Sequence, residues 1–127
     1  MIDLAIKKEC GVIVMHRNPG SENIHQKADY EDVVDQVNTH LIIQTENLIE
    51  KGVNRSQIAV DPGLGFGKKM EDSKELFFNL HNLINTYPIV VGYSRKKFTD
   101  QLNMTNNEMI DHCLDSGVDL LRLHLDN

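Results

Sequence analysis

The sequence predicts an α/β protein whose strands run parallel. Short apolar runs rich in β-branched residues alternate with longer amphipathic stretches, and polar motifs follow directly after the apolar runs. Strands that are separated by helices run parallel and are joined by right-handed crossovers. Ligands in such folds bind at the carboxyl ends of the strands, so we looked for functional residues there.

Seven elements are expected, in the order β-α-β-α-β-α-β. The apolar runs predict strands at residues 12–15, 57–60, 89–91 and 118–124. Apolar spacings of three and four predict helices over residues 29–50 and 72–86. Asp29 is the expected N-cap of the first helix and Gly52 its stop. A third, short helix is expected between a capping box at Thr105 and Glu108 and a C-terminal stop at Gly117.

Composition narrows the class of protein. The 127 residues are the usual size of one domain, 40% of them are hydrophobic, and the net charge is −6. A generic nucleic-acid or membrane-surface binder normally carries the opposite charge, so neither partner is expected. No apolar run reaches the length of a membrane span and the N-terminus has no signal-peptide core, so we expect a cytoplasmic protein in which Cys10 and Cys113 are reduced thiols.

Charged and polar motifs follow all four expected strands. They are His16 and Arg17, the segment 61–68, the segment 92–97, and the pair Arg122 and His124. Because parallel strands place their carboxyl ends together, we expect these groups on one rim. The rim would collect cations around a single carboxylate, Asp61, which is typical of an anion site with one acceptor inside it.

The glycine-rich segment after the second strand does not match the known phosphate loops. Gly63, Gly65 and Gly67 are spaced by two. A dinucleotide fingerprint would need glycine in place of Lys68, and a P-loop would need glycine in place of Pro62. The glycines either let the backbone approach a ligand or form a flexible strand-to-helix loop.

Four motifs together resemble the second half of dihydropteroate synthase, in order and spacing, over nearly the whole chain. They are Val14-Met-His16, Asp61-Pro-Gly-x-Gly-Phe-Gly-Lys68, Gly92-x-Ser-Arg-Lys96 and Arg122-x-His124. The resemblance implies a TIM barrel of which this chain holds strands five to eight, so residues 1–127 would be one truncated pterin-binding domain. It also implies a transferase of folate biosynthesis that joins p-aminobenzoate to hydroxymethyl-dihydropterin diphosphate and releases pyrophosphate.

The same resemblance implies roles for the pterin and diphosphate residues. Asp61 would accept hydrogen bonds from the guanidine-like edge of the pterin. Lys96 would donate to the opposite side of the ring, and Arg122 with His124 would hold the diphosphate as it leaves. The chemistry would therefore rest on Lys96, Arg122 and His124. The alternatives are a helix cap for Asp61, a solvated surface lysine, a structural ion pair for Arg122 and a core histidine.

The remaining substrate contacts implied by the resemblance are less distinctive. Ser94 would bind the carboxylate of p-aminobenzoate, Phe66 would pack on its ring, and Met15 would lie against the pterin. Gly92 opens the motif that carries Ser94 and Lys96, and counts with the substrate-binding residues. Simple packing is the alternative for Phe66, and a place in the core is the alternative for Met15.

Half a barrel leaves open questions about partners and function. A TIM barrel has eight strands, and four are expected here, so two sheet edges and an inner apolar face need a cover. We expect a homodimer or association with an N-terminal half. The family's Mg²⁺ would be bound by the absent half, no metal ligand is expected in this chain, and activity of the isolated chain is doubtful. The alternatives are a pterin-binding methyltransferase-like domain, or an inactive fragment or partner subunit that completes another barrel.

Overall fold

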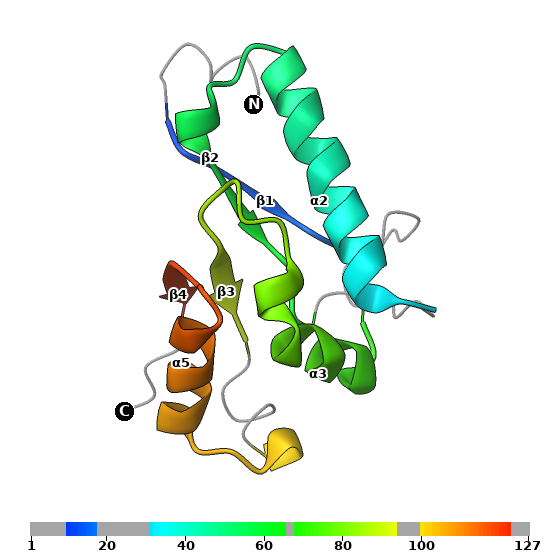
Figure 1. Ribbon diagram of the computed structural model, residues 1–127, viewed down its shortest axis with the longest axis vertical. Helices are drawn as coiled ribbons and strands as arrows, with labels where there is room; N and C mark the ends of the chain where they lie inside the picture. The colour runs from blue at the N-terminus through cyan, green and yellow to red at the C-terminus, as the bar shows by residue number, and fades with distance from the viewer. Residues whose placement is uncertain (1–9, 18–30, 66–67, 94–99, 123–127) are drawn as a thin grey trace.

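The computed structural model describes residues 10–17, 31–65, 68–93 and 100–122 (Figure 1). It has four short strands separated by helices, which is the predicted order. The strands are β1 (Val12–Met15), β2 (Ile58–Asp61), β3 (Val90–Gly92) and β4 (Leu120–Arg122). The helices are α2 (Val33–Glu50), α3 (Met70–Phe78) and α5 (Asn106–Asp115), with 3-10 turns at Arg55–Gln57 and Leu80–Asn82.

The strands follow one another in chain order and are parallel. β1 pairs with β2, and β3 pairs with β4. A parallel bridge between Val60 and Ile89 joins the two pairs, and the amide of Val60 donates to the carbonyl of Pro88 at 2.9 Å. The arrangement is that of consecutive β/α units of a barrel, so the predicted fold class is confirmed.

The helices cover one face of the strands. Figure 1 shows α2 alongside β1 and β2, and α5 beside β3 and β4. Helix α3 lies near the first turn of α2. Every second strand residue packs with these helices in one apolar core; these residues are Val12, Val14, Ile58, Val60, Ile89, Val91 and Leu121. Because side chains alternate along a strand, the intervening residues face the other way.

That second face is the inner face of the barrel. Met15, Asp61, Gly92 and Arg122 lie at its carboxyl end. Below them the same face carries Ile13 and Leu120, whose exposed fractions are 54% and 55%. Val90 is buried but stands outside the core that the helices form. The inner face thus has a polar rim above an apolar layer.

Two helix boundaries differ from the sequence prediction. Helix α2 begins after Asp32, whose Oδ1 accepts from the amide of Asp35 at 3.1 Å, so Asp29 is not its N-cap; residue 29 itself lies outside the described residues. Gly52 does take a positive φ of 105° just after this helix, whose C-cap is Lys51.

The predicted helix over residues 72–86 was too long. Helix α3 ends at Phe78, because Asn79 leaves helical geometry and its Nδ2 donates to the carbonyl of Glu75 at 2.8 Å. A 3-10 turn follows, yet Leu80 and Leu83 are still buried. The apolar spacing therefore predicted correctly which residues are buried, but its prediction of one continuous helix was wrong.

The third helix matches its prediction closely. Thr105 Oγ1 accepts from the amide of Glu108 at 3.1 Å, and Glu108 Oε1 accepts from the amide of Thr105 at 3.0 Å, so the capping box is formed. Gly117 has a φ of 91°, as a left-handed stop requires. The last strand spans Leu120–Arg122 within the described part of the chain, and residues 123 and 124 of the prediction lie outside it.

Two further expectations concern the chain as a whole. Cys10 and Cys113 are free cysteines; Cys113 is buried, which raises the pKa of its thiol to about 11. Within the described residues, none of the helices combines the length and the apolar character that a membrane span needs.

Candidate functional site

The candidate site lies at the carboxyl ends of the strands, on the inner face. Asp61 is the last residue of β2, and Arg122 is the last residue of β4. Met15 is the register partner of Asp61, and Gly92 is the register partner of Arg122. The four residues come from four different strands, so tertiary structure brings them together.

Asp61 is the buried carboxylate of this rim, with only 1% of its surface exposed. Its Oδ1 accepts from the amide of Gly63 at 2.8 Å, and its Oδ2 accepts from Arg122 Nη2 at 3.0 Å. Burial raises the pKa of Asp61, while the bonds and charges of Gly63, Arg122 and Lys68 oppose that shift. Asp61 is not a helix cap, which was the alternative. Its hydrogen bonds go to the amide of a turn residue and to an arginine that is far away in the sequence.

Arg122 reaches Asp61 by lying across Gly92. A Cβ at position 92 would be 3.1 Å from Arg122 Nη2 and 3.3 Å from Nε. The absence of a side chain at Gly92 therefore leaves room for the guanidinium. The Arg122 side chain is 57% exposed, so one end of the ion pair is buried and the other is open to solvent.

The turn after β2 is fixed by Gly63. Its φ is +70°, and a Cβ there would overlap the backbone carbonyl of His16. The His16 amide in turn donates to the carbonyl of Asp61 at 3.0 Å. Close approach of the protein's own backbone at His16 therefore requires this glycine, and the approach of a ligand to the glycines stays a prediction.

Lys68 lies beneath this turn and is 2% exposed. Its Nζ donates to the carbonyl of Gly63 at 2.8 Å. Burial lowers the pKa of Lys68 to about 7, although the charges of Asp61 and Asp72 favour the protonated form. Burying a lysine costs free energy of folding unless its ammonium is hydrogen-bonded and paired with an opposite charge. The Gly63 carbonyl and the two carboxylates supply both here.

Two histidines lie near Lys68, of which His16 is buried and His40 is half-buried. His16 is 2% exposed and meets the ring of His40 edge to face at 4.8 Å. Burial lowers the pKa of His16 to about 3, helped by the positive charge of Lys68 and by His40. Burial and Lys68 also lower the pKa of His40. His16 is therefore neutral at neutral pH.

The structure brings together part of the predicted site. Met15, Asp61, Gly92 and Arg122 share the rim, whereas four other predicted residues lie outside the described residues: Phe66, Ser94, Lys96 and His124. Sequence reasoning gave no role to Lys68 or His40. Lys68 closes the glycine-rich motif, and His40 adjoins the apolar positions 37 and 41 of α2; neither signal by itself distinguishes a buried polar residue from a solvated one.

The residues at this rim are a poor set of ligands for the Mg²⁺ of the family. Asp61 is the carboxylate that the strands bring to the rim, and both of its oxygens already accept hydrogen bonds. In residues 10–17, 31–65, 68–93 and 100–122, no three His, Cys, Asp or Glu side chains are grouped closely enough to hold a metal. The described residues do not fit Mg²⁺, whose ligands are oxygens in octahedral geometry.

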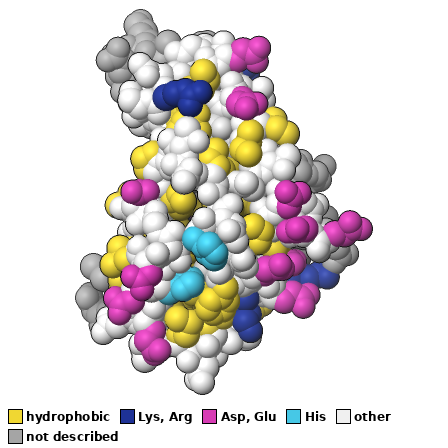
Figure 2. Space-filling view, viewed as in Figure 1, with side chains coloured by type: hydrophobic (Ala, Val, Ile, Leu, Met, Phe, Trp, Pro, Cys, Tyr) yellow, Lys and Arg dark blue, Asp and Glu magenta, His cyan; other side chains and the backbone are white. Residues whose placement is uncertain are grey.

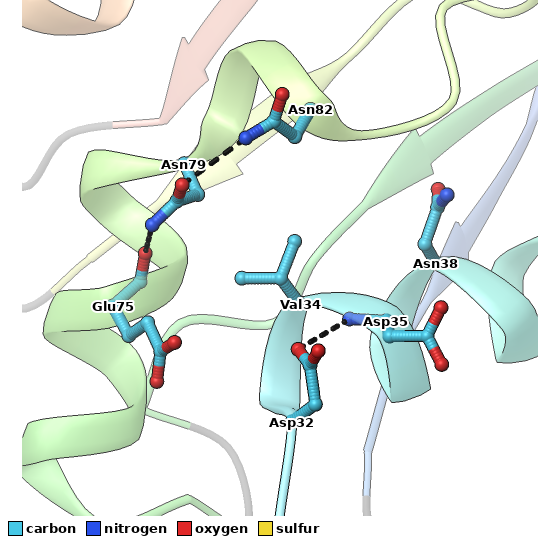
Figure 3. A pocket seen from close by; sticks show the side chains of 7 residues that line it. All are labelled: Asp32, Val34, Asp35, Asn38, Glu75, Asn79 and Asn82. Carbon is cyan, nitrogen blue, oxygen red and sulfur yellow. Dashed lines mark hydrogen bonds between the residues drawn. The ribbon is translucent and has the colours of Figure 1, made fainter.

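A separate polar pocket lies between α2 and α3 (Figure 3). Its volume is about 340 Å³, and its lining is Asp32, Val34, Asp35, Asn38, Glu75, Asn79 and Asn82. Its asparagines bond within the protein: Asn38 Oδ1 accepts from the amide of Ile84, and Asn82 Nδ2 donates to Asn79 Oδ1. Figure 2 shows acidic side chains gathered on the side of the molecule where α2 begins and α3 lies. This pocket shares no residue with the rim.

Comparison with known proteins identifies the family. The family described as "Pterin binding enzyme" matches residues 1–124, and the chain belongs to that family. The curated relatives and solved structures to which it is similar are dihydropteroate synthases. It is 35% identical over 98 residues to the Mycobacterium leprae enzyme, covering 74% of this chain and 34% of the relative. It is 29% identical over 136 residues to the Streptococcus pyogenes enzyme, covering 98% of this chain and 48% of the relative.

Solved structures agree with the fold. The dihydropteroate synthase of Thermus thermophilus superposes with a TM-score of 0.78 at 28% identity, covering 98% of this chain and 51% of that chain. The chain thus spans between a third and a half of the curated relatives' length and about half of this structure. The match is to part of a TIM barrel, as the motifs predicted.

Proposed function

We propose that this chain carries the pterin and diphosphate side of a dihydropteroate synthase site, and that residues 1–127 form a single, incomplete pterin-binding unit. The observation that supports it is the Asp61–Arg122 pair: a buried carboxylate and a half-exposed guanidinium, 3.0 Å apart, on the inner rim. The substrates would be hydroxymethyl-dihydropterin diphosphate and p-aminobenzoate.

Asp61 suits the pterin because of how its oxygens are held. A pterin edge offers an N–H and an amino group side by side, as a guanidinium does. Arg122 Nη2 already occupies Asp61 Oδ2 with this kind of donor. The arginine therefore stands where one donor of a pterin edge would bind, and the buried carboxylate is pre-oriented by the Gly63 amide on its other oxygen.

Arg122 suits the diphosphate because its side chain is charged and 57% exposed. When a pterin takes its place on Asp61, the guanidinium can bind the negatively charged leaving group. His124 and Lys96 would assist by resemblance, and Ser94 with Phe66 would hold p-aminobenzoate. Met15 would lie against the pterin, since it is the register partner of Asp61.

The reaction needs positioning and charge stabilisation rather than covalent help from the protein. The amine nitrogen of p-aminobenzoate forms a bond to the methylene carbon, and the carbon–oxygen bond to the diphosphate breaks. Pyrophosphate leaves with the electron pair, and the amine releases a proton to solvent. Holding both substrates and stabilising pyrophosphate are the steps to which these residues contribute.

The proposed site needs the rest of a barrel, because these residues span about half the length of the solved synthase they match. Ile13 and Leu120 expose over half of their surface on the inner face, which favours closure by a second copy or by an N-terminal half. Any Mg²⁺ that accompanies the diphosphate would take its protein ligands from that added part. Turnover by the isolated chain is not expected.

Calorimetric titration tests the proposal. The chain should bind 6-hydroxymethylpterin and pyrophosphate, and Asp61→Asn should lose pterin affinity by tenfold or more, roughly the effect of one charged hydrogen bond. Asp111→Asn is the matched control, because Asp111 is an exposed carboxylate on α5. Equal pterin affinity in Asp61→Asn and Asp111→Asn would refute the assigned role.

A partner-subunit function is the second candidate, and the exposed inner face favours it. A chain that binds a separate N-terminal half of a dihydropteroate synthase without any pterin affinity would support it. Turnover of p-aminobenzoate by the combined halves would instead support the synthase and exclude a methyltransferase-like domain.

A further inference from the structure

The buried lysine at the end of the glycine-rich turn has no part in the proposed reaction. We propose that Lys68 is the positioning residue for Asp61: it holds the Gly63 turn that binds one carboxylate oxygen, and it places a positive charge beneath the carboxylate. The inference rests on the proposed function, because it explains how the pterin-binding acid is kept in place.

The first support is a continuous chain of short hydrogen bonds. Lys68 Nζ donates to the Gly63 carbonyl at 2.8 Å, and the Gly63 amide donates to Asp61 Oδ1 at 2.8 Å. The two groups lie in adjacent peptide units on either side of the Gly63 Cα, so the lysine holds the same turn whose amide binds the acid. A Cβ at position 63 would be 3.2 Å from Lys68 Nζ, so the ammonium lies directly against this turn.

The second support is the balance of charge around the ammonium. Five elements contribute groups to it. Asp61 on β2 and Asp72 on α3 are the acidic groups whose charges act on the ammonium. His16 after β1 and His40 on α2 are affected by its charge, and Arg122 reaches Asp61 from β4. Asp61 and Asp72 attract the ammonium. The two histidines disfavour their own protonation beside it, so they add no competing charge at neutral pH.

The third support is the unequal exposure of the two cations. Lys68 is 2% exposed, whereas the Arg122 side chain is 57% exposed. If Arg122 turns toward a diphosphate, Asp61 loses that partner. Lys68 stays, because its place beneath the turn is closed, and it continues to favour the ionised carboxylate.

The test is carbon-detected NMR of the Asp61 carboxyl across a pH titration of the ligand-free chain. In Lys68→Met, the Asp61 midpoint should rise by about one pH unit or more, since an opposite charge nearby shifts a carboxyl by that amount. Lys68→Arg, which keeps the charge, should move it back toward the parent value. Lys51→Met, at the exposed C-cap of α2, is the matched control. The same Asp61 midpoint in Lys68→Met and Lys51→Met would overturn the proposal.

A reciprocal measurement covers the case in which Lys68→Met does not fold. The Lys68 side-chain midpoint, followed by NMR, should fall in Asp61→Asn and stay at its parent value in Asp111→Asn. An unchanged Lys68 midpoint in Asp61→Asn contradicts the coupling. Because these titrations use no ligand, they judge Lys68 separately from the pterin titration: failure to bind 6-hydroxymethylpterin counts against the proposed function and leaves the measured coupling intact.

Discussion

Two regions of this molecule use carboxylates differently: of the described residues, the rim has a single one, and the pocket between α2 and α3 has several. At the rim, Asp61 is buried and is bonded to Gly63 and Arg122. In the pocket between α2 and α3, Asp35 and Glu75 are exposed, and Asp32 caps the start of α2. The difference teaches that burial, rather than the number of charges, makes a polar contact specific, because water screens the exposed charges and not the buried ones.

Backbone fit at the rim gives the largest expected effect. Gly63→Ala should lower the free energy of unfolding by more than about 3 kcal/mol, because the new Cβ meets the His16 carbonyl and the residue needs a positive φ. Gly65→Ala is the matched control: its φ is +85°, but none of the described residues lies within 4 Å of the position that a Cβ would take, so it should cost only about 1–2 kcal/mol. Urea denaturation measures both, and equal losses would show that the close approach to His16 is unimportant.

The energy of coupling between charged side chains should be the next largest difference between the rim and the pocket. A double-mutant cycle of Asp61→Asn with Lys68→Met should give a coupling energy of about 1–3 kcal/mol, because each substitution leaves the other charge buried with one fewer partner. The cycle of Asp35→Asn with Glu75→Gln in the pocket should give less than about 0.5 kcal/mol, since both side chains are exposed. Coupling energies of similar size would remove the distinction between the regions.

The pH dependence of stability sharpens the comparison further. The pKa of His16 is lowered to about 3 in the folded chain from an ordinary 6.5, so the unfolded chain takes up the proton first as pH falls. The His16 contribution to stability is complete above pH 6.5 and is lost toward pH 3, at up to about 1.4 kcal/mol per pH unit. The raised pKa of Asp61 acts with the opposite sign, because its contribution is lost as pH rises through the folded value.

His16→Gln isolates this contribution. It should flatten the fall in stability between pH 6.5 and pH 3. His81→Gln, at an exposed position in the 3-10 turn, is the matched control. Chemical denaturation at several pH values measures the slope. Lys68 acts in a separate window, from about pH 7 to its ordinary 10.5, through which stability should rise. Identical slopes for His16→Gln and the parent chain would contradict the assignment.

The smallest effect on stability is expected at the exposed end of the rim pair. Arg122→Gln should change the free energy of unfolding by only about 1 kcal/mol, because the Arg122 side chain is 57% exposed and Asp61 keeps its bond to the Gly63 amide. Its pyrophosphate affinity should nevertheless fall by roughly tenfold, as the proposed function requires. Arg55→Gln, in the exposed 3-10 turn before β2, is the control for a general loss of positive charge. Equal pyrophosphate affinities in the two variants would remove Arg122 from the anion site.

The sequence predicted the outline of the fold because that outline follows from local patterns. Apolar runs gave the strands, and a capping box with a following glycine gave α5 almost to the residue. The patterns failed where local side chains redirected the backbone: Asp32 starts α2, and Asn79 ends α3. The spacing of apolar residues alone could not show that Asp32 and Asn79, rather than their neighbours, set the helix ends.

The same division holds for the rim. By itself the sequence predicted that Asp61 and Arg122 stand near the carboxyl ends of strands that helices separate, because the alternation of apolar runs and amphipathic stretches is a local pattern. Only the tertiary structure decided that Arg122 crosses Gly92 to reach Asp61. It also decided that Lys68 and His16 are buried, with the half-buried His40 against the His16 ring. Burial and charge pairing depend on contacts between residues distant in the chain, and no local pattern encodes those contacts.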